Sequence, residues 1–473
     1  MVNNHNNILH NRSFILALAF FIGIALEVVL KIGILYLLFL IGIASIFTLI
    51  FLKKAIFFIL ILFLTALVGA FFVNIHRVEH ITGRVKAVGT VVYTSRRTVV
   101  LKSVEIFRNR WESTYGKCRI YIGKRIKINV NIGDSVYIDG TATSSNIPGD
   151  ICAVNVYETR QIGNLPSDNR IFGVFFLKIN ELRGHFISEF KRLIPHYSFL
   201  ASSILLGDRM EIPENVYSVI RRSGFIHVFA ISGMHVMIFA AIIFAALSFL
   251  GIPRNEKYIT MIASILFFIF LTGFSIPTIR AGFMAILMLL MRLLDRSVKA
   301  IDVIGAVALA FMLADPYIVF EASFQLTFIG TIALVLLTPI FYDWISRSIP
   351  HKLISEYLAV ILAVNTGMIP IISYHFGVIY FGAIPLNATV VPMLLSILLE
   401  MGFVLIFLLF IHIPFLSIIF GYALDAFLNV FYYITYFTAH LPKGIVNIRM
   451  NIWAVMCIYI TLLTLVYIYQ EVK

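Results

Sequence analysis

Charged side chains are scarce in this sequence of 473 residues, of which 13% are charged and 60% are hydrophobic. A soluble globular protein carries about a quarter charged residues, so the composition excludes a chain made only of ordinary soluble domains. Apolar stretches of about 20 residues, long enough to cross a bilayer, recur from Ser13 to Tyr469. The sequence therefore predicts a polytopic α-helical membrane protein.

Cysteine and nucleotide-binding signals are also sparse. The sequence has three cysteines, and no Cys or His spacing resembles a zinc site. It has no Gly-x-x-x-x-Gly-Lys-Ser/Thr loop for a nucleotide phosphate. We therefore expect no metal and no cofactor, and any step driven by a nucleotide would depend on another protein.

Acidic residues are outnumbered, with 24 Asp and Glu against 37 Lys and Arg, which gives a net charge of +13. Basic loops on the cytoplasmic side of a membrane explain part of this excess. Lys53 and Lys54 lie between the second and third apolar segments, so that loop and the N-terminus are expected in the cytoplasm. The third helix then ends on the other side, which places residues 74–170 outside the cytoplasm.

Four parts are expected along the chain. Residues 1–73 hold three transmembrane helices, at 13–30, 33–52 and 55–73, and residues 74–170 form a small all-β domain. Residues 171–224 are amphipathic and suit helices that lie on the membrane face. The final part, residues 225–473, is a membrane domain with spans expected at 225–250, 258–273, 276–294, 300–314, 322–341, 353–372, 415–437 and 452–469, and with a broken or re-entrant piece within 380–411.

The β segment contains five short runs rich in Val, Ile and Thr that are separated by turn residues. They lie at 81–93, 98–107, 118–123, 135–142 and 152–158. Five strands in under 100 residues suit an OB-fold, a partly open barrel that often binds oligonucleotides. A small barrel of another type also fits this pattern.

Ten basic residues and several aromatic residues are interleaved near the centre of this segment. Basic side chains follow a phosphate backbone and aromatic faces stack on bases, although the same patch could rest on anionic lipid headgroups. The candidate DNA-binding residues are Arg96, Arg97, Lys102, Arg108, Arg110, Trp111, Lys117, Arg119, Lys124, Arg125 and Lys127.

Cys118 and Cys152 fall in the same segment. Because the segment is placed outside the reducing cytoplasm, we expect a disulfide between them. Two unpaired buried thiols are the alternative.

Ionisable residues also occur inside the apolar half. A charge at bilayer depth is costly and usually faces a polar cavity. Arg280 points to an anionic path or to a buried acidic partner such as Asp208, while His227 and His235 could equally be packing residues. Ser232 and His235 raise the alternative of an intramembrane serine hydrolase, but their spacing of three on one helix argues against a hydrogen bond between them.

Several motifs resemble the signature of the ComEC family, the inner-membrane DNA channels of bacterial natural transformation. The sequence has ILLGDR at 204–209, RRSGFIHVFAISGMHV at 221–236, IPTIRA at 276–281, DP at 315–316, ASFQLTF at 322–328, PIISYHFG at 370–377, PLN at 385–387 and, after the β segment, NIPGD at 146–150. The resemblance covers about residues 74–392. It implies a channel lined by some of Asp208, Arg209, Arg221, Arg222, His227, Ser232, His235, Arg280 and Gln325.

The family resemblance also implies partners and a location. We expect a multi-pass protein of the bacterial inner membrane that takes up single-stranded DNA, with a DNA receptor, a nuclease and a cytoplasmic helicase as partners. Many relatives carry a C-terminal metallo-β-lactamase-like domain, but no His-x-His-x-Asp-His cluster occurs here. We therefore expect no enzymatic activity, in either a short family member or part of a longer chain.

Overall fold

The computed structural model describes residues 12–30, 54–75, 83–95, 98–107, 111–114, 117–121, 135–143, 150–161, 170–209, 211–229, 231–379, 385–386, 389–441 and 446–472. The chain divides into two compact units. Unit 1 comprises Met1–Pro166 and Val298–Leu336, and unit 2 comprises Ser167–Ser297 and Leu337–Lys473. The span expected at 33–52 lies outside the described residues.

Unit 1 contains a helical group and a sheet. Its helices are α1 (Arg12–Leu30), α3 (Lys54–Ile75), α10 (Ala300–Ala314), the short 3-10 helix η3 (Pro316–Phe320) and the first part of α11 (Ala322–Ile345). A Cβ at Gly23 would lie 1.7 Å from the Ala66 carbonyl oxygen, and one at Gly69 would lie 2.4 Å from that of Phe20. The backbones of α1 and α3 therefore touch, as small residues allow in membrane helix pairs.

The sheet of unit 1 closes on itself. Its strands are β1 (Gly83–Ser95), β2 (Thr98–Phe107), β3 (Trp111–Thr114), β4 (Lys117–Tyr121), β5 (Ser135–Thr143) and β6 (Asp150–Gln161). Their order is β1-β5-β6-β4-β2-β3, and β1 also pairs with β2, so β1, β5, β6, β4 and β2 form a ring. The β4–β6 pair is parallel and the other pairs are antiparallel.

Alternation explains the interior of this ring. On β1, Val85, Ala87 and Val91 are buried, and Leu101, Ile138 and Val154 are fully enclosed on the other strands. Side chains two residues apart point to one face of a strand, so the apolar set faces inward. The strands overlap all five predicted runs, and among the strands that the structure describes only the short β3 was not predicted.

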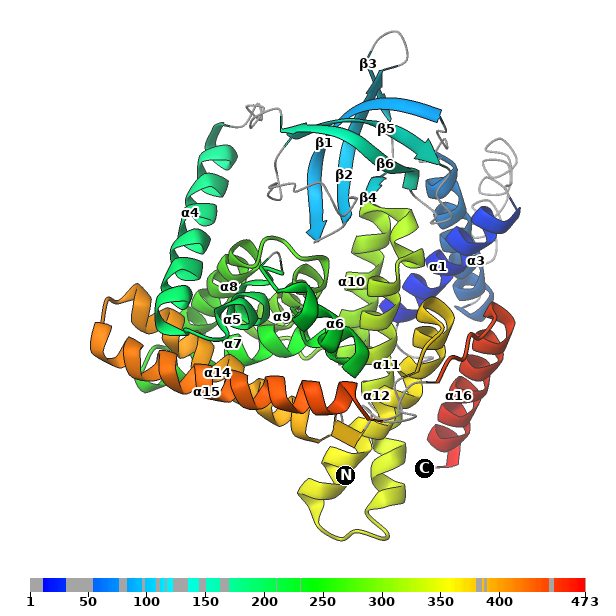
Figure 1. Ribbon diagram of the computed structural model, residues 1–473. Helices are drawn as coiled ribbons and strands as arrows, with labels where there is room; N and C mark the ends of the chain where they lie inside the picture. Colours follow the sequence, from blue (N-terminus) through cyan, green and yellow to red (C-terminus); the bar gives the residue numbers. More distant parts are fainter. Residues whose placement is uncertain are drawn as a thin grey trace. The chain divides into compact units, whose positions relative to one another are not determined.

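Unit 2 is helical (Figure 1). Its elements are α4 (Arg170–Leu193), α5 (Ser198–Leu206), α6 (Glu214–Ser223), η2 (Phe225–Phe229), α7 (Gly233–Phe249), α8 (Arg254–Leu271), α9 (Ile276–Leu293), the end of α11, α12 (Lys352–Phe376), α14 (Val390–Phe410), α15 (Pro414–Ala439) and α16 (Ile452–Val472). Across the described residues of both units, six helices are long and apolar enough to cross a membrane: α9, α11, α12, α14, α15 and α16. The predicted polytopic helical class is confirmed at this level.

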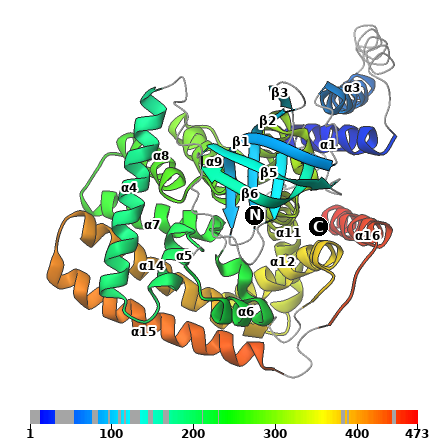
Figure 2. The same cartoon turned by 45° about the horizontal axis from the view of Figure 1, so that its top comes forward.

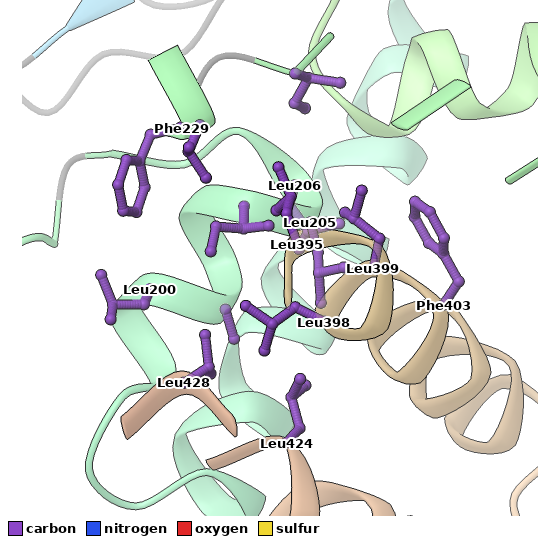
Figure 3. Packing of buried hydrophobic residues seen from close by; sticks show 14 of the residues in the cluster. Leu200, Leu205, Leu206, Phe229, Leu395, Leu398, Leu399, Phe403, Leu424 and Leu428 are labelled. Carbon is purple, nitrogen blue, oxygen red and sulfur yellow. The ribbon is translucent and has the colours of Figure 1, made fainter. Parts of the chain in front are cut away.

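The core of unit 2 corrects one prediction. Residues 171–206 were expected on the membrane face, and α4 is amphipathic as expected. However, all seven residues from Leu200 to Leu206 in α5 are buried. Figure 3 shows Leu200, Leu205 and Leu206 packed against leucines of α14 and α15. Because α5 is apolar on all sides, it is a core helix rather than a surface one.

Two predicted spans also differ in detail. The span expected at 225–250 is interrupted, since η2 ends at Phe229 and α7 begins only at Gly233. The piece expected to be broken within 380–411 contains the regular helix α14 over most of its length. Helices α14 and α15 lie side by side in both views (Figures 1 and 2).

Candidate functional site

Four helix ends meet in unit 2. Gly207 follows α5 with a φ of 74°, a left-handed conformation that favours glycine. A Cβ at Gly207 would lie 2.9 Å from Ile231 Cδ1 and 3.7 Å from the Thr272 carbonyl oxygen. A Cβ at Gly233 would lie 3.8 Å from Ala281 Cβ. The end of α5, the start of α7, the end of α8 and the start of α9 therefore form one cluster, which we call the helix-end junction.

The backbone at this junction is irregular. Between α8 and α9, Gly273 has a φ of 68° and Phe274 a φ of 53°, and the second value is uncommon for a bulky residue. Ser275 then caps α9, because its hydroxyl accepts a hydrogen bond from the Thr278 backbone N–H at 3.4 Å. Non-helical backbone at membrane depth occurs only where protein surrounds it or where it lines a water-filled cavity. The junction therefore joins its helices through non-helical backbone.

Arg280 lies at this junction, in the first turns of α9, and its exposed fraction is 0%. The positive end of the helix dipole lies at the N-terminus, so a cation there does not stabilise α9. Burial of a guanidinium is also costly, and the group cannot lose its charge. The burial of Arg280 therefore has to be compensated by the groups that surround it. The structure encloses it and does not present it to an open path.

Other buried polar side chains accompany Arg280. Ser203, His235 and Thr278 are each 0% exposed. The hydroxyl of Ser203 donates to the carbonyl oxygen of Asp208, and Arg209 Nε donates to the carbonyl oxygen of Phe229 at 2.8 Å. These bonds hold the chain in place just after α5, where the regular backbone ends.

Ser232 and His235 are in contact, contrary to the prediction from their spacing. Ser232 is the N-cap of α7 rather than a residue within it, so its side chain turns toward His235. The distance from Ser232 Oγ to His235 Nδ1 is 3.1 Å, and the Ser232 backbone N–H donates to the same nitrogen at 3.1 Å. The expectation that the two side chains could not meet was wrong. Their contact is a capping box, with His235 fully buried.

The structure does not bring all the predicted channel residues together. Arg221 and Arg222 lie exposed at the end of α6, and His227 lies exposed in η2, where its Nδ1 is 3.1 Å from the Gly224 carbonyl oxygen. Gln325 belongs to unit 1, where its Nε2 donates to the Val319 carbonyl oxygen at 2.8 Å.

Arg183 was missed by the sequence analysis. Its Nη2 donates to the Leu206 carbonyl oxygen, the last of α5, at 3.1 Å. Burial lowers the pKa of Arg183, and the negative charge of Asp208 opposes that shift. Arg183 precedes the buried Phe186 and Phe190 by three and seven residues. That spacing places it on the apolar face of α4, which was a usable signal.

Asp425 on α15 was also missed, and it holds the other end of α5. Its Oδ1 accepts hydrogen bonds from the backbone N–H groups of His196, at 3.3 Å, and Tyr197, at 3.1 Å. Its Oδ2 lies 2.8 Å from His196 Nδ1. A carboxylate within an apolar helix is itself a signal of a polar partner.

The predicted DNA-binding residues of the β domain are described only in part. Arg96, Arg97, Arg108, Arg110, Lys124, Arg125 and Lys127 lie outside the described residues, and of Lys102 on β2 and Trp111 on β3 only the backbone is described. Arg119 on β4 is half-buried. Lys117, also on β4, is paired with two carboxylates, Asp315 at 2.9 Å and Glu321 at 2.5 Å. Its positive charge is therefore neutralised by carboxylates of unit 1, so Lys117 is not a DNA contact in our interpretation.

Cys118 and Cys152 are partners in the backbone register of the parallel pair of β4 and β6. Cys118 is buried, and the side chain of Cys152 is not among those described. Their adjacency in the register agrees with the predicted disulfide, which stays a prediction.

The sequence is similar to one protein family and to one characterised protein. A family model described as "Competence protein" matches residues 204–472, more than half of the chain. The chain is also 31% identical over 219 residues to "ComE operon protein 3" of Bacillus subtilis (strain 168), and the match covers 46% of this chain and 27% of that protein. The chain thus matches well under two thirds of the length of that relative. No solved structure matches the chain. The matched region contains the helix-end junction and the motifs that surround it, and the chain belongs to the ComEC family of competence proteins.

Proposed function

We propose that this protein is the membrane channel through which one strand of DNA enters the cytoplasm during natural transformation. The observation that carries the proposal is the helix-end junction with the enclosed Arg280 next to Ala281, which lies against Gly233. Broken helices whose ends meet inside a membrane domain form the substrate sites of many transporters. A guanidinium offers several donors to a phosphate and keeps its charge at any relevant pH.

In this proposal the junction is closed in the present structure and opens during transport. A dense basic lining would trap the strand, because conduction needs binding that is weak enough to release. An enclosed cation that becomes accessible on opening meets that requirement. Asp208 and Arg209, directly after α5, would then lie at the edge of the path.

The β domain supports DNA binding outside the membrane domain. A five-stranded closed ring with one parallel pair is the arrangement expected of an OB-like barrel. We propose that residues 74–170 form this barrel on the extracytoplasmic side of the inner membrane and bind single-stranded DNA. The remaining predicted basic residues and Trp111 would provide phosphate contacts and stacking.

Further partners follow from the same proposal. A DNA receptor and a nuclease would deliver the strand, and a cytoplasmic helicase would supply the driving force, because the sequence has no nucleotide-binding loop. Residues 1–73 would form the N-terminal helices and residues 225–473 the channel domain, with the amphipathic α4 between them and the buried α5 as part of the core. A hydrolase that uses Ser232 has no support beyond the 3.1 Å contact, which helix capping already explains.

Uptake of labelled DNA tests the proposal. Cells that lack the gene should bind fluorescent double-stranded DNA at the surface but should not accumulate labelled strand in the cytoplasm, and the gene in trans should restore uptake. Continued uptake without the gene contradicts the channel. A serine-reactive probe that labels the wild type but not Ser232→Ala would instead favour the hydrolase.

A further inference from the structure

The helices α7, α8 and α9 carry their charged residues at one end. The three helices pack against one another in pairs, and the start of α7, the end of α8 and the start of α9 belong to the helix-end junction. Apart from the enclosed Arg280, every Asp, Glu, Lys and Arg of these helices lies in the first turn of α8 or the last turn of α9. We call residues 248–258 and 292–297, at the end opposite to the junction, the basic end.

Between the junction and the basic end, the outer sides of the three helices are apolar. Met237 on α7, Ile259 on α8 and Phe283 on α9 are all exposed, and α9 has the length and hydropathy of a membrane span. In a membrane protein, an apolar outer surface that ends in basic residues marks the passage from acyl chains to lipid headgroups. The basic end therefore has the position of a headgroup contact.

Hydrogen bonds join the three helices at the basic end. Arg254 Nη2 donates to the Arg292 carbonyl oxygen at 2.9 Å and lies 2.8 Å from the Asp295 carboxylate, which links the start of α8 to the end of α9. Lys257 Nζ donates to Ser248 Oγ at 2.9 Å, which links α8 to the last turns of α7. The basic end is therefore one surface built from three helices.

This surface has an excess of positive charge. Its four basic residues outnumber its two acidic residues. Arg254 is paired with Asp295, but among the described residues no carboxylate forms an ion pair with Lys257, Arg292 or Arg296. These three cations can therefore interact with an anion from outside the chain.

Large apolar side chains lie at the same end. Phe249 is 92% exposed and Leu250 is 69% exposed, at the connection from α7 to α8. Tyr258 lies beneath the guanidinium of Arg254, whose carbon is 5.6 Å from the ring centroid, and tyrosine is enriched at membrane–water interfaces. Exposed apolar side chains next to cations are the pattern that inserts into the surface of an anionic membrane. A free phosphate or a nucleic acid would leave Phe249 and Leu250 in water.

From these observations we infer that the basic end binds the headgroups of anionic phospholipids. Lys257, Arg292 and Arg296 face the lipid phosphates, and Phe249 and Leu250 insert among the acyl chains. Because α9 has 18 residues and is therefore about 27 Å long, this contact sets the depth of the helix-end junction in the bilayer. The inference goes beyond the channel proposal and does not rest on it.

Fluorescence quenching with the full-length protein in lipid nanodiscs tests the surface. A bimane fluorophore is attached to Asn255→Cys, at an exposed position in the first turn of α8. The background is Cys457→Ser, which removes an exposed native thiol, and this background protein alone measures labelling of the other cysteines. A nitroxide quencher near the headgroup is carried either by phosphatidylglycerol or by phosphatidylcholine at the same mole fraction. The ratio of the two quenching constants gives the local enrichment of the anionic lipid.

Two pairs of substitutions remove the same charge from different places. Arg292→Gln with Arg296→Gln acts at the basic end. Lys178→Gln with Lys191→Gln is the matched control, because both lysines are exposed on α4, outside this surface.

The parent protein should enrich phosphatidylglycerol about fivefold or more, which is the attraction expected of one cation at an anionic surface. The Arg pair should bring the ratio close to one, the Lys pair should leave it unchanged, and added salt should lower it. If the Arg pair fails to accumulate, Arg296→Gln alone, at an exposed position after α9, should still lower the ratio.

Three results would overturn the inference. Equal quenching by the two lipids in the parent protein, or unchanged enrichment in the accumulated Arg variants, would show that the cations do not select anionic lipid. Weak quenching by both lipids would show that the basic end does not reach the bilayer. Loss of the enrichment when a thymidine oligonucleotide is added would show that the surface binds nucleic acid instead. None of these results affects the channel proposal, which DNA uptake without the gene decides separately.

Discussion

The ammonium group of Lys117 lies 2.5 Å from the carboxylate of Glu321. The same ammonium group lies 2.9 Å from Asp315, so one lysine on β4 joins both ends of η3. Burial alone would lower the pKa of Lys117, but the charges of Glu321 and Asp315 raise it above its ordinary value of 10.5. The lysine therefore stays charged, and the β domain is fastened to the α10–α11 connection.

We expect Lys117→Met to destabilise this attachment by about 3 kcal/mol, because removal of one member of a largely buried pair leaves uncompensated charge. Protection of the β domain from limited proteolysis should fall. The exchange Lys117→Glu with Glu321→Lys should recover most of the protection, and Lys86→Met, at an exposed position on β1, should have no effect. Unchanged protection in Lys117→Met would show that the pair does not hold the domain.

Arg280 provides a second prediction. Arg280→Gln should reduce DNA uptake about tenfold or more, since the cation offered to the strand is lost, while the amount of protein in the membrane stays close to wild type. Arg280→Lys should be intermediate, because it keeps the charge without the guanidinium geometry. Uptake per cell and immunoblots of the membrane fraction measure the two effects. If Arg280→Gln does not accumulate, the residue is structural.

Asp425 provides a third. Asp425→Leu leaves the N–H groups of His196 and Tyr197 without their acceptor, and we expect a loss of about 2–3 kcal/mol in stability. Asp425→Asn keeps one oxygen and should lose about 1 kcal/mol. Thermal unfolding in detergent measures both variants, with Asn451→Ala, at the start of α16, as a capping control of ordinary size. Equal melting temperatures for all three variants would exclude a special role for Asp425.

The cysteine pair provides a fourth. Cys118 and Cys152 lie opposite each other on β4 and β6, and a disulfide between them would stabilise the domain by roughly 3–4 kcal/mol in the chain-entropy model. Alkylation of unreduced, denatured protein should modify Cys457 alone. Modification of all three cysteines would contradict the disulfide.

Acid sensitivity of the β domain provides a fifth. Arg84 donates a hydrogen bond to Asp139 at 3.2 Å, which lowers the pKa of Asp139 below its ordinary value of 3.8. Because the folded-state pKa is the lower one, the stabilisation is present above pH 3.8 and is lost as the pH falls through the lowered value. Arg84→Ala should therefore make unfolding less dependent on pH below that point. An unchanged acid transition would show that the pair is too exposed to matter.

Local pattern predicted the elements well, and tertiary contacts account for what it missed. Alternation and turn residues located five strands, and apolar length located most helices, because both signals are contained in short windows. The break before α7 was missed, since it depends on the capping box between Ser232 and His235 rather than on a change in hydropathy. Burial of α5 depends on α14 and α15, which lie about 200 residues later in the sequence.

The residues of the site differ in the same way in how far the sequence predicts them. Arg280 was found because a charge in an apolar segment is conspicuous in the sequence alone. The partners of Lys117 could not be found that way, because Asp315 and Glu321 approach it only after the β domain and α10 have packed. Arg183 and Asp425 are both recognisable in the sequence as charges on apolar helix faces. Their hydrogen-bond partners, the backbone groups at the two ends of α5, could not be predicted, because these groups do not lie at a fixed spacing along the sequence.

The fixation of α5 at both ends limits how the membrane domain can move. The carboxylate of Asp425 sits at its N-terminus and the guanidinium of Arg183 at its C-terminus, each of the sign that complements the helix dipole. A movement of α5 along its axis would break the hydrogen bonds at both of its ends. These bonds therefore hold α5 in a fixed position relative to α4 and α15. On its other side the end of α5 is close to Ile231, just before α7, and to Thr272, just after α8, since a Cβ at Gly207 would lie 2.9 Å from the first and 3.7 Å from the second.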